Sequence, residues 1–269
     1  MTNPVFLADE LPEGAGSFAL AGAEGHHAHV MRLGPGAGID VADGRGNRLR
    51  GVVAEVTGDG VRIDVASVTH EGDDVELVLV QALAKGGRDE EAIEMATEVG
   101  ADAIVPWQAD RSIAQWPAAK ATCAAARWES VLRAATKQSR RSRVPALLEL
   151  MDSRRLEAFV RRTVADGGVV LVLHEAADRT LDAVGLPRAG RVVVVVGPEG
   201  GITPQELAAM SAAEAVPVLA GPHVMRSGTA GPVAISHVAR AIGRWGVGPR
   251  SAADTLGSRR PTRGVEGPA

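Results

Sequence analysis

Cysteine and aromatic residues are scarce in this chain, and each shortage excludes a class of structure. Cys123 is the single cysteine among 269 residues, which excludes an intramolecular disulfide and a cysteine-rich zinc site. Tyrosine is absent and aromatic residues make up only 3% of the chain, so the core must be built mainly from Val, Leu, Ile and Ala. The formal net charge of −4 shows no overall basic excess. Any contact with nucleic acid must therefore come from a local cluster of Lys and Arg.

Long apolar runs are absent as well. No stretch approaches the roughly 20 apolar residues that a membrane-spanning helix needs. The N-terminus also lacks the charged-then-apolar pattern of a secretory signal. These absences predict a cytoplasmic protein without a membrane partner.

The stretch around which the chain is organised is RVVVVVGPEGGITPQE, residues 191–206. Five consecutive valines, residues 192–196, predict a strand buried on both faces, as in a parallel sheet covered by helices. The glycine-rich turn of residues 197–201 follows, and Thr203 and Glu206 then form the capping box of a helix. In open α/β sheets, ligands bind in the crevice outside the carboxyl ends of the strands. This turn is therefore a candidate ligand site.

The composition of that turn narrows the choice of ligand. It matches neither the GxGxxG motif nor the phosphate-binding loop that ends in Gly-Lys-Ser/Thr. Glu199 lies within it, and its charge would repel a polyphosphate. A neutral or cationic ligand is favoured, although a plain strand-to-helix turn without a ligand has the same spacing.

Two regions with different patterns divide the chain. Short alternating runs and turn clusters in residues 1–72 predict a small antiparallel barrel or sandwich. Strand and helix patterns alternate in residues 73–248, which predicts a parallel sheet with helices on both faces. Residues 249–269 are rich in Gly, Pro, Ser and Arg and are predicted to be disordered.

The expected elements of the second region can be placed along the chain. Strands are predicted at 76–82, 103–106, 169–173, 192–196 and 216–219, and helices at 89–99, 117–142, 152–164, 206–215 and 232–245. Ile235, Val238, Ile242 and Trp245 are expected on the packed side of the last helix. Loops at 174–175, 197–201 and 220–230 would then meet at one edge of the sheet.

A histidine cluster, Gly25-His26-His27-Ala28-His29, stands out in the first region. A metal site would require further ligands, and no supporting carboxylate spacing is evident. The preferred interpretation is a short helical turn leading into residues 30–33, whose apolar members would face the barrel.

The helix predicted at 117–142 carries the strongest indication of a partner. Trp128 and Leu132 fall on one face, whereas Arg133, Lys137, Arg140 and Arg141 are predicted on the opposite face, and Arg143 follows the helix. An ordinary solvated face mixes charges of both signs, and this one does not. Contact with a phosphate backbone is the favoured hypothesis, and a solvated face is the alternative.

Taken together, four segments resemble a known family. They are VQALAKGGRDEEAIEMATEVGADAIVPW, RWESVLRAATKQSRRSRVP, VVVGPEGGIT and LAGPHVMRSGTAG, in that order. They are similar to the 16S ribosomal RNA (uracil-N3)-methyltransferases of the SPOUT superfamily, and HHAHVMRLGPGAGIDVADGRG resembles their PUA-like RNA-binding domain.

The resemblance implies a PUA-like barrel followed by a SPOUT α/β domain that contains a trefoil knot. It also implies S-adenosylmethionine as methyl donor, a homodimer, 16S rRNA in the small ribosomal subunit as partner, and no metal. Two alternatives remain: another SPOUT reaction such as 2′-O-ribose methylation, and a non-catalytic rRNA-binding assembly factor.

The same resemblance assigns roles to individual residues. Arg226 matches the family's arginine and is the candidate catalytic residue, with a structural ion pair as the alternative. Gly228 departs from the glutamate that many members carry, which leaves no carboxylate for a general base there. The candidate donor-binding residues are Leu173, His174, Glu175, Gly197, Pro198, Glu199, Gly201, Leu219, Gly221, Met225, Ser227, Thr229 and Ala230. The candidate RNA-binding residues are Arg32, Lys85, Arg88, Arg133, Lys137, Arg140, Arg141 and Arg143.

Overall fold

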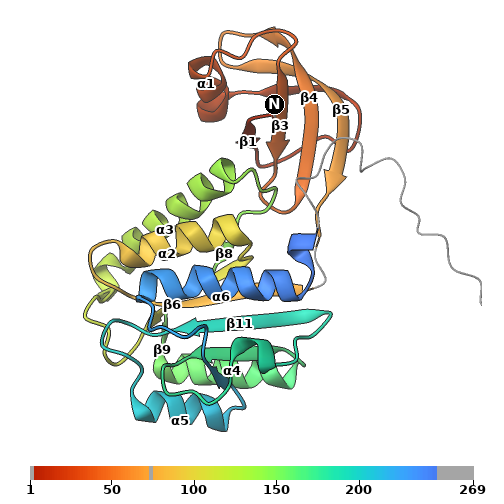
Figure 1. The fold of residues 1–269 in the computed structure, drawn as a ribbon. Coiled ribbons are helices and arrows are strands. Elements are labelled where there is room, and N and C mark those ends of the chain that lie inside the picture. Colours follow the sequence, from red (N-terminus) through yellow and green to blue (C-terminus); the bar gives the residue numbers. More distant parts are fainter. Residues whose placement is uncertain (1–2, 73–74, 247–269) are drawn as a thin grey trace, which may run out of the picture.

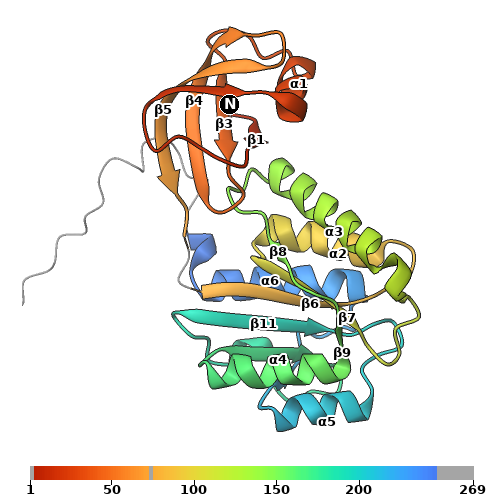
Figure 2. The ribbon, with the colours of Figure 1, turned by 180° about the vertical axis from the view of Figure 1, so that it is seen from behind.

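The computed structural model describes residues 3–72 and 75–246. A small sheet lies at one end of the molecule, above a larger sheet that is covered by helices on both sides (Figures 1 and 2). The tail at 249–269, for which disorder was predicted, and the junction residues 73–74 lie outside the described residues. No helix in the described ranges is long and apolar enough to cross a membrane.

The small sheet has five strands in the order β1-β3-β4-β5-β2. Its elements are β1 (Val5–Leu7), β2 (Gly16–Leu20), α1 (Gly22–Val30), β3 (Gly38–Ala42), β4 (Asn47–Val56) and β5 (Val61–His70). The predicted antiparallel pairing holds for β2–β5, β3–β4 and β4–β5, whereas β1 pairs with β3 in parallel. The sheet packs around its own core, which includes Phe6, Ile39, Leu49 and Ile63.

The predicted helical turn at the histidine cluster is confirmed as α1, but its apolar end was placed wrongly. Val30 is 65% exposed and Met31 is 46% exposed, whereas Leu33 does pack against the core of the small sheet. The reason is that α1 contacts the sheet through its smallest residues. A Cβ on Gly25 would lie 2.5 Å from the backbone oxygen of Asp59, so the helix approaches closely there and Val30 and Met31 are left in solvent.

All strand pairs of the larger sheet are parallel, in the order β12-β10-β11-β6-β7-β8, with β9 also paired to β7. Its strands are β6 (Val75–Ala82), β7 (Ala103–Gln108), β8 (Ala146–Leu147), β9 (Met151–Asp152), β10 (Val169–Leu173), β11 (Gly190–Val196) and β12 (Val216–Val218). Its helices are α2 (Arg88–Val99), α3 (Ala118–Gln138), α4 (Ser153–Ala165), α5 (Pro204–Ala212) and α6 (Ser227–Ala241), with short 3-10 turns η1 (Leu181–Ala183) and η2 (Arg244–Gly246).

The structure confirms that the valine run forms a strand buried on both faces. Val192, Val194 and Val196 belong to the core under α2, α3 and α6, whereas Val193 and Val195 belong to the core under α4 and α5. The two groups of helices lie on opposite sides of β6 and β11 (Figures 1 and 2). Burying one valine side chain contributes about 1.5 kcal/mol or more, so this run anchors the middle of the sheet.

Helices α3 and α6 differ most from their predicted bounds. Helix α3 ends at Gln138, and Arg140 follows with φ +59°, so residues 139–142 continue as a loop. Helix α6 begins at Ser227 rather than at Pro232, with Arg226 as its N-cap. Proline is favoured in the first helical turn, which suggested a later start, but here it lies inside the helix. The same helix ends at Ala241, so Trp245 is not on its packed side and is 54% exposed.

Candidate active site

Three loops meet at the carboxyl ends of β10, β11 and β12, as the buried-strand pattern predicts. They enclose a cavity of about 740 Å³. The capping box after β11 holds one of them, because the Thr203 hydroxyl accepts from Glu206 N and a Glu206 carboxylate oxygen accepts from Thr203 N. The end of the loop after β11 and the first turn of α5 are therefore fixed to each other.

Nearly all of the residues predicted to bind a cofactor line this cavity. These are Leu173, His174, Glu175, Gly197, Pro198, Glu199, Gly201, Leu219, Gly221, Met225, Ser227 and Ala230. Arg226, the candidate catalytic residue, also lines it. The structure thus brings together side chains that are up to 57 positions apart along the chain, from Leu173 to Ala230.

Thr229 is the exception, since it does not line the cavity. The reason is the early start of α6. Because residues 227–230 form the first helical turn, successive side chains point about 100° apart, and Ser227 and Ala230 face the cavity while Thr229 is exposed.

Ser227 acts on the site through the backbone of a neighbouring loop. Its hydroxyl donates to Gly197 O at 2.8 Å and accepts from the side-chain nitrogen of Gln81 at 2.9 Å. Gln81 is fully buried at the end of β6 and was not singled out in the sequence. This chain of hydrogen bonds ties the end of β6, the turn after β11 and the start of α6 together.

Charge in the cavity is more balanced than the sequence suggested. Glu199 lies 3.6 Å from the guanidinium of Arg88, so its repulsion toward anions is partly neutralised. Arg88 was predicted to contact RNA, yet it lines the cavity. Among the described residues, the guanidinium of Arg226 has no carboxylate within 4.0 Å and is available to a ligand.

Asp89 supports the loop that precedes α2. It is 6% exposed, and its carboxylate accepts from the backbone nitrogens of Ala84 and Glu90. Burial raises the pKa of Asp89 above its ordinary value, and the hydrogen bonds offset only part of that effect. The carboxylate thus holds the loop that carries Lys85 against the first turn of α2, which begins at Arg88.

Two further residues belong to the site. Arg111, in the loop between β7 and α3, lines the cavity and donates to Gly200 O at 3.2 Å. Glu206 fixes that loop, because it accepts from Asp110 N at 2.8 Å and from the Ser153 hydroxyl at 2.6 Å. Burial alone would raise the pKa of Glu206, but its hydrogen bonds to Asp110, Ser153 and Thr203 outweigh burial and lower it. The position of Arg111 after a parallel strand was the signal that could have indicated it.

The predicted RNA-binding residues divide into two groups. Arg32, Lys85, Arg88, Arg133 and Arg140 are exposed, whereas Lys137, Arg141 and Arg143 are partly buried. Lys137 binds Glu24 of α1 at 2.7 Å, and Arg141 binds Asp102 at 3.0 Å. The prediction of one continuous basic face is therefore wrong for Lys137, because its side chain meets α1, and for Arg141, because it lies beyond the end of α3 and binds Asp102.

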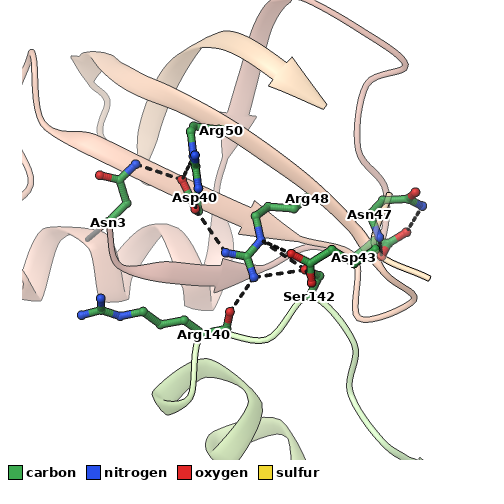
Figure 3. Close-up of polar contacts among 9 residues, drawn as sticks. Asn3, Asp40, Asp43, Asn47, Arg48, Arg50, Arg140 and Ser142 are labelled. Atoms are coloured by element: carbon green, nitrogen blue, oxygen red, sulfur yellow. Dashed lines mark hydrogen bonds and ion pairs between the residues drawn. The ribbon is translucent and has the colours of Figure 1, made fainter. Parts of the chain in front are cut away.

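The loop after α3 is attached to the small sheet by Arg48 of β4 (Figure 3). Arg48 donates to the backbone oxygen of Arg140 and, at 3.1 Å, to the hydroxyl of Ser142. On its other side Arg48 lies 3.3 Å from Asp40, a 2% exposed carboxylate that also binds Arg50. Because Arg48 joins residues more than 90 positions apart, it fixes the basic loop against the small sheet.

Comparisons with known proteins agree with this architecture. A family model described as an RNA methyltransferase domain matches residues 71–239, and one described as an RNA methyltransferase PUA domain matches residues 20–66. The ribosomal RNA small subunit methyltransferase E of Mycobacterium tuberculosis is 42% identical over 249 residues, covering 91% of this chain and 94% of that protein. The protein of the same name from Bacillus subtilis is 29% identical over 84% of this chain and 91% of its own length.

Solved structures share the fold. The ribosomal RNA small subunit methyltransferase E of Neisseria gonorrhoeae, solved bound to S-adenosyl methionine, superposes with a TM-score of 0.78 at 24% identity, covering 89% of this chain and 98% of that one. Because one family model spans most of the larger sheet and a relative is 42% identical along nearly its whole length, this chain belongs to the RNA methyltransferase family.

Proposed function

We propose that this protein transfers a methyl group from S-adenosylmethionine to N3 of a uridine in the 16S rRNA of the small ribosomal subunit. The observation that carries the proposal is the cavity enclosed by three loops at one edge of the parallel sheet. The names of the relatives from M. tuberculosis and B. subtilis support the ribosomal RNA substrate, and the solved N. gonorrhoeae relative supports the donor. The choice of N3 rests on the resemblance in the sequence motifs.

The cavity fits such a donor in size and in chemistry. Its volume of about 740 Å³ lies within the roughly 300–1,000 Å³ of small-molecule sites. Glycine-rich turns expose backbone groups to a ligand, and Glu199, which Arg88 neutralises only in part, supplies negative charge that favours a cation. When bound, S-adenosylmethionine supplies an electrophilic methyl group on a positively charged sulfur.

Arg226 is the residue proposed to assist the transfer. N3 of uracil carries a proton and is a poor nucleophile, so the reaction requires loss of that proton and stabilisation of the resulting charge on O2 and O4. The guanidinium of Arg226 lines the cavity and has no acidic partner among the described residues. A guanidinium at this place can donate hydrogen bonds to one of these oxygens and so stabilise the charge that develops there.

The reaction is tested with small subunits from a strain that lacks the gene, incubated with the purified protein and S-adenosylmethionine. Mass spectrometry of the digested rRNA should detect 3-methyluridine. A ribose-methylated product would contradict the position, and a protein that neither binds S-adenosylmethionine in calorimetry nor transfers a methyl group would contradict the function.

Arg226→Ala should lower turnover by about 10²–10³-fold, the usual effect of removing one preorganised donor, while affinity for S-adenosylmethionine stays within a few-fold. Arg161→Ala is the matched control, because Arg161 is exposed on α4 and does not line the cavity. Unchanged turnover in Arg226→Ala would remove Arg226 from the mechanism.

We also propose a division of labour between residues 1–72, which bind RNA, and residues 73–248, which form a trefoil-knotted methyltransferase unit. Leu219 exchanges backbone hydrogen bonds with Arg179 and Leu181, so the segment after β12 runs beside the connection between β10 and β11, which supports a knot.

A cytoplasmic homodimer is part of the proposal, and the exposed Trp245 near α6 supports an interface with a second copy. Sedimentation equilibrium of the full chain tests it.

A further inference from the structure

The loop between β7 and α3 places an arginine at the rim of the cavity, in addition to the three loops that follow β10, β11 and β12. Arg111 is exposed, lines the cavity and donates one hydrogen bond at 3.2 Å to the backbone oxygen of Gly200. Among the described residues, no carboxylate lies within 4.0 Å of its guanidinium. Most of its donors are therefore free to bind a ligand.

The base of this side chain is held rigidly. Asp110 N donates to Glu206 at 2.8 Å, and Ser112, the residue after Arg111, is 7% exposed and donates its N–H to Ala109 O. The backbone of Arg111 also packs directly on the glycine-rich turn. A Cβ on Gly200 would lie 3.0 Å from both the Cβ and the backbone oxygen of Arg111. Little backbone order would have to be gained when a ligand binds the guanidinium.

The charges around the rim select the chemistry of that ligand. Three guanidiniums line the cavity, those of Arg88, Arg111 and Arg226, and only Arg88 has an acidic partner, Glu199. Arg226 is assigned to the uracil in the proposed function. The remaining cation, Arg111, has the fork geometry that binds two oxygens of one oxyanion.

We propose that Arg111 binds a phosphate of the RNA backbone beside the target uridine and thereby positions that nucleotide over the cavity. This inference rests on the proposed function, since RNA must be the substrate. The methionine carboxylate of the donor is an oxyanion of similar chemistry. RNA phosphate is favoured because Arg111 and Gly200 are both exposed, so an anion held between them lies at the rim and remains accessible to a large substrate.

The test compares Arg111→Gln with the wild type and with the matched control Arg161→Gln, which removes one positive charge from α4 away from the cavity. Arg111→Lys keeps the positive charge but lacks the planar guanidinium that can bind two oxygens of one oxyanion. Affinity for unmodified small subunits is measured without donor between about 50 and 200 mM salt, and affinity for S-adenosylmethionine is measured separately by calorimetry.

Arg111→Gln should weaken subunit binding about tenfold, as expected for one charge-assisted contact, and should reduce the slope of log K against log salt by about 0.7 to 0.9. Arg111→Lys should restore the slope but not the full affinity. S-Adenosylmethionine affinity should stay within twofold, KM for subunits should rise, and kcat should change less than KM.

Two results would overturn the proposal. One is a salt slope and subunit affinity in Arg111→Gln that equal those of Arg161→Gln. The other is a loss of S-adenosylmethionine affinity with unchanged RNA binding, which would assign Arg111 to the carboxylate of the donor. A wild-type protein without methyl transfer would refute the proposed function alone, because the slope is measured in the absence of donor and a reduced slope would still support the phosphate contact.

Discussion

Replacing Glu206 by glutamine tests the connection between the cavity loops and the rest of the fold. Glu206 is 5% exposed and accepts four hydrogen bonds, from Asp110 N, the Ser153 hydroxyl, Thr203 N and the Thr203 hydroxyl, at 2.6 to 2.9 Å. Glutamine has nearly the same size, but one of its two terminal atoms is an NH2 group. In either orientation this group faces a backbone N–H that can only donate.

The expected loss of stability follows from the hydrogen bonds that Glu206 accepts and glutamine cannot. At least one backbone hydrogen bond to a charged acceptor disappears, and a hydrogen bond to a charged group contributes about 1.5–3 kcal/mol. A buried donor is left unsatisfied at the same time, so Glu206→Gln should lower the free energy of unfolding by about 2–4 kcal/mol near neutral pH. Solvent screening reduces this little because the carboxylate is buried.

The pH dependence gives the sharper test. The pKa of Glu206 is lowered in the folded state from the ordinary value of 4.5, so the folded protein binds that proton less readily than the unfolded chain. The stabilisation is therefore complete above the unfolded pKa and is lost as pH falls through the folded pKa. The difference between wild type and Glu206→Gln should be full at about pH 7 and should narrow below about pH 4.5.

Urea unfolding followed by circular dichroism, once at about pH 7 and once below about pH 4.5, measures this difference in the free energy of unfolding. Glu157→Gln is the matched control, because Glu157 is a partly exposed residue of α4 that pairs with Arg161 and touches neither loop. A Glu206→Gln variant as stable as the wild type, or a difference that is the same at both pH values, would refute the reasoning. A looser loop should also weaken binding of S-adenosylmethionine, which calorimetry measures.

Two further predictions concern the junction and the basic helix. Asp40→Asn should cost about 3 kcal/mol in urea unfolding, because Arg48 and Arg50 lose the carboxylate they share, and an unchanged midpoint would contradict the role of this cluster. Arg133→Glu should weaken small-subunit binding several-fold and flatten its salt dependence in a filter assay, whereas indifference would identify the exposed part of α3 as a solvated surface.

Local signals in the sequence were sufficient to predict most of the strands and helices of the larger sheet. A valine run has no polar position to expose, so it is buried on both sides, and the Thr203–Glu206 capping box is complete within four residues. The three loops of the cavity could be predicted to lie together because the carboxyl ends of parallel strands lie at one edge of a sheet. Those rules depend only on neighbours along the chain and on strand direction.

Contacts between distant segments were outside the reach of those rules. Lys137 and Arg141 were counted as part of a basic face, but partners more than 35 positions away, Glu24 and Asp102, occupy them. Pro232 indicated a late helix start, whereas hydrogen bonds of Ser227 to Gly197 and Gln81 hold the earlier turn. In each case the side chain interacts with a residue far away along the chain, and the periodicity of the sequence does not show such a contact.

The valine run of β11 has a consequence for how the cavity keeps its shape. In most strands a slip of one residue exposes the apolar side and is therefore forbidden. Sliding β11 by one position would still place a valine at four of the five buried positions, so burial opposes the slip only at one end, where Arg191 or Gly197 would enter the core. The polar ends must supply the missing specificity: Arg191 binds Glu76 directly across the sheet at 2.6 Å, and Gly197 O accepts from Ser227 at 2.8 Å. Alignment of the glycine-rich turn thus relies on contacts at the two ends of β11 more than on the five valines between them.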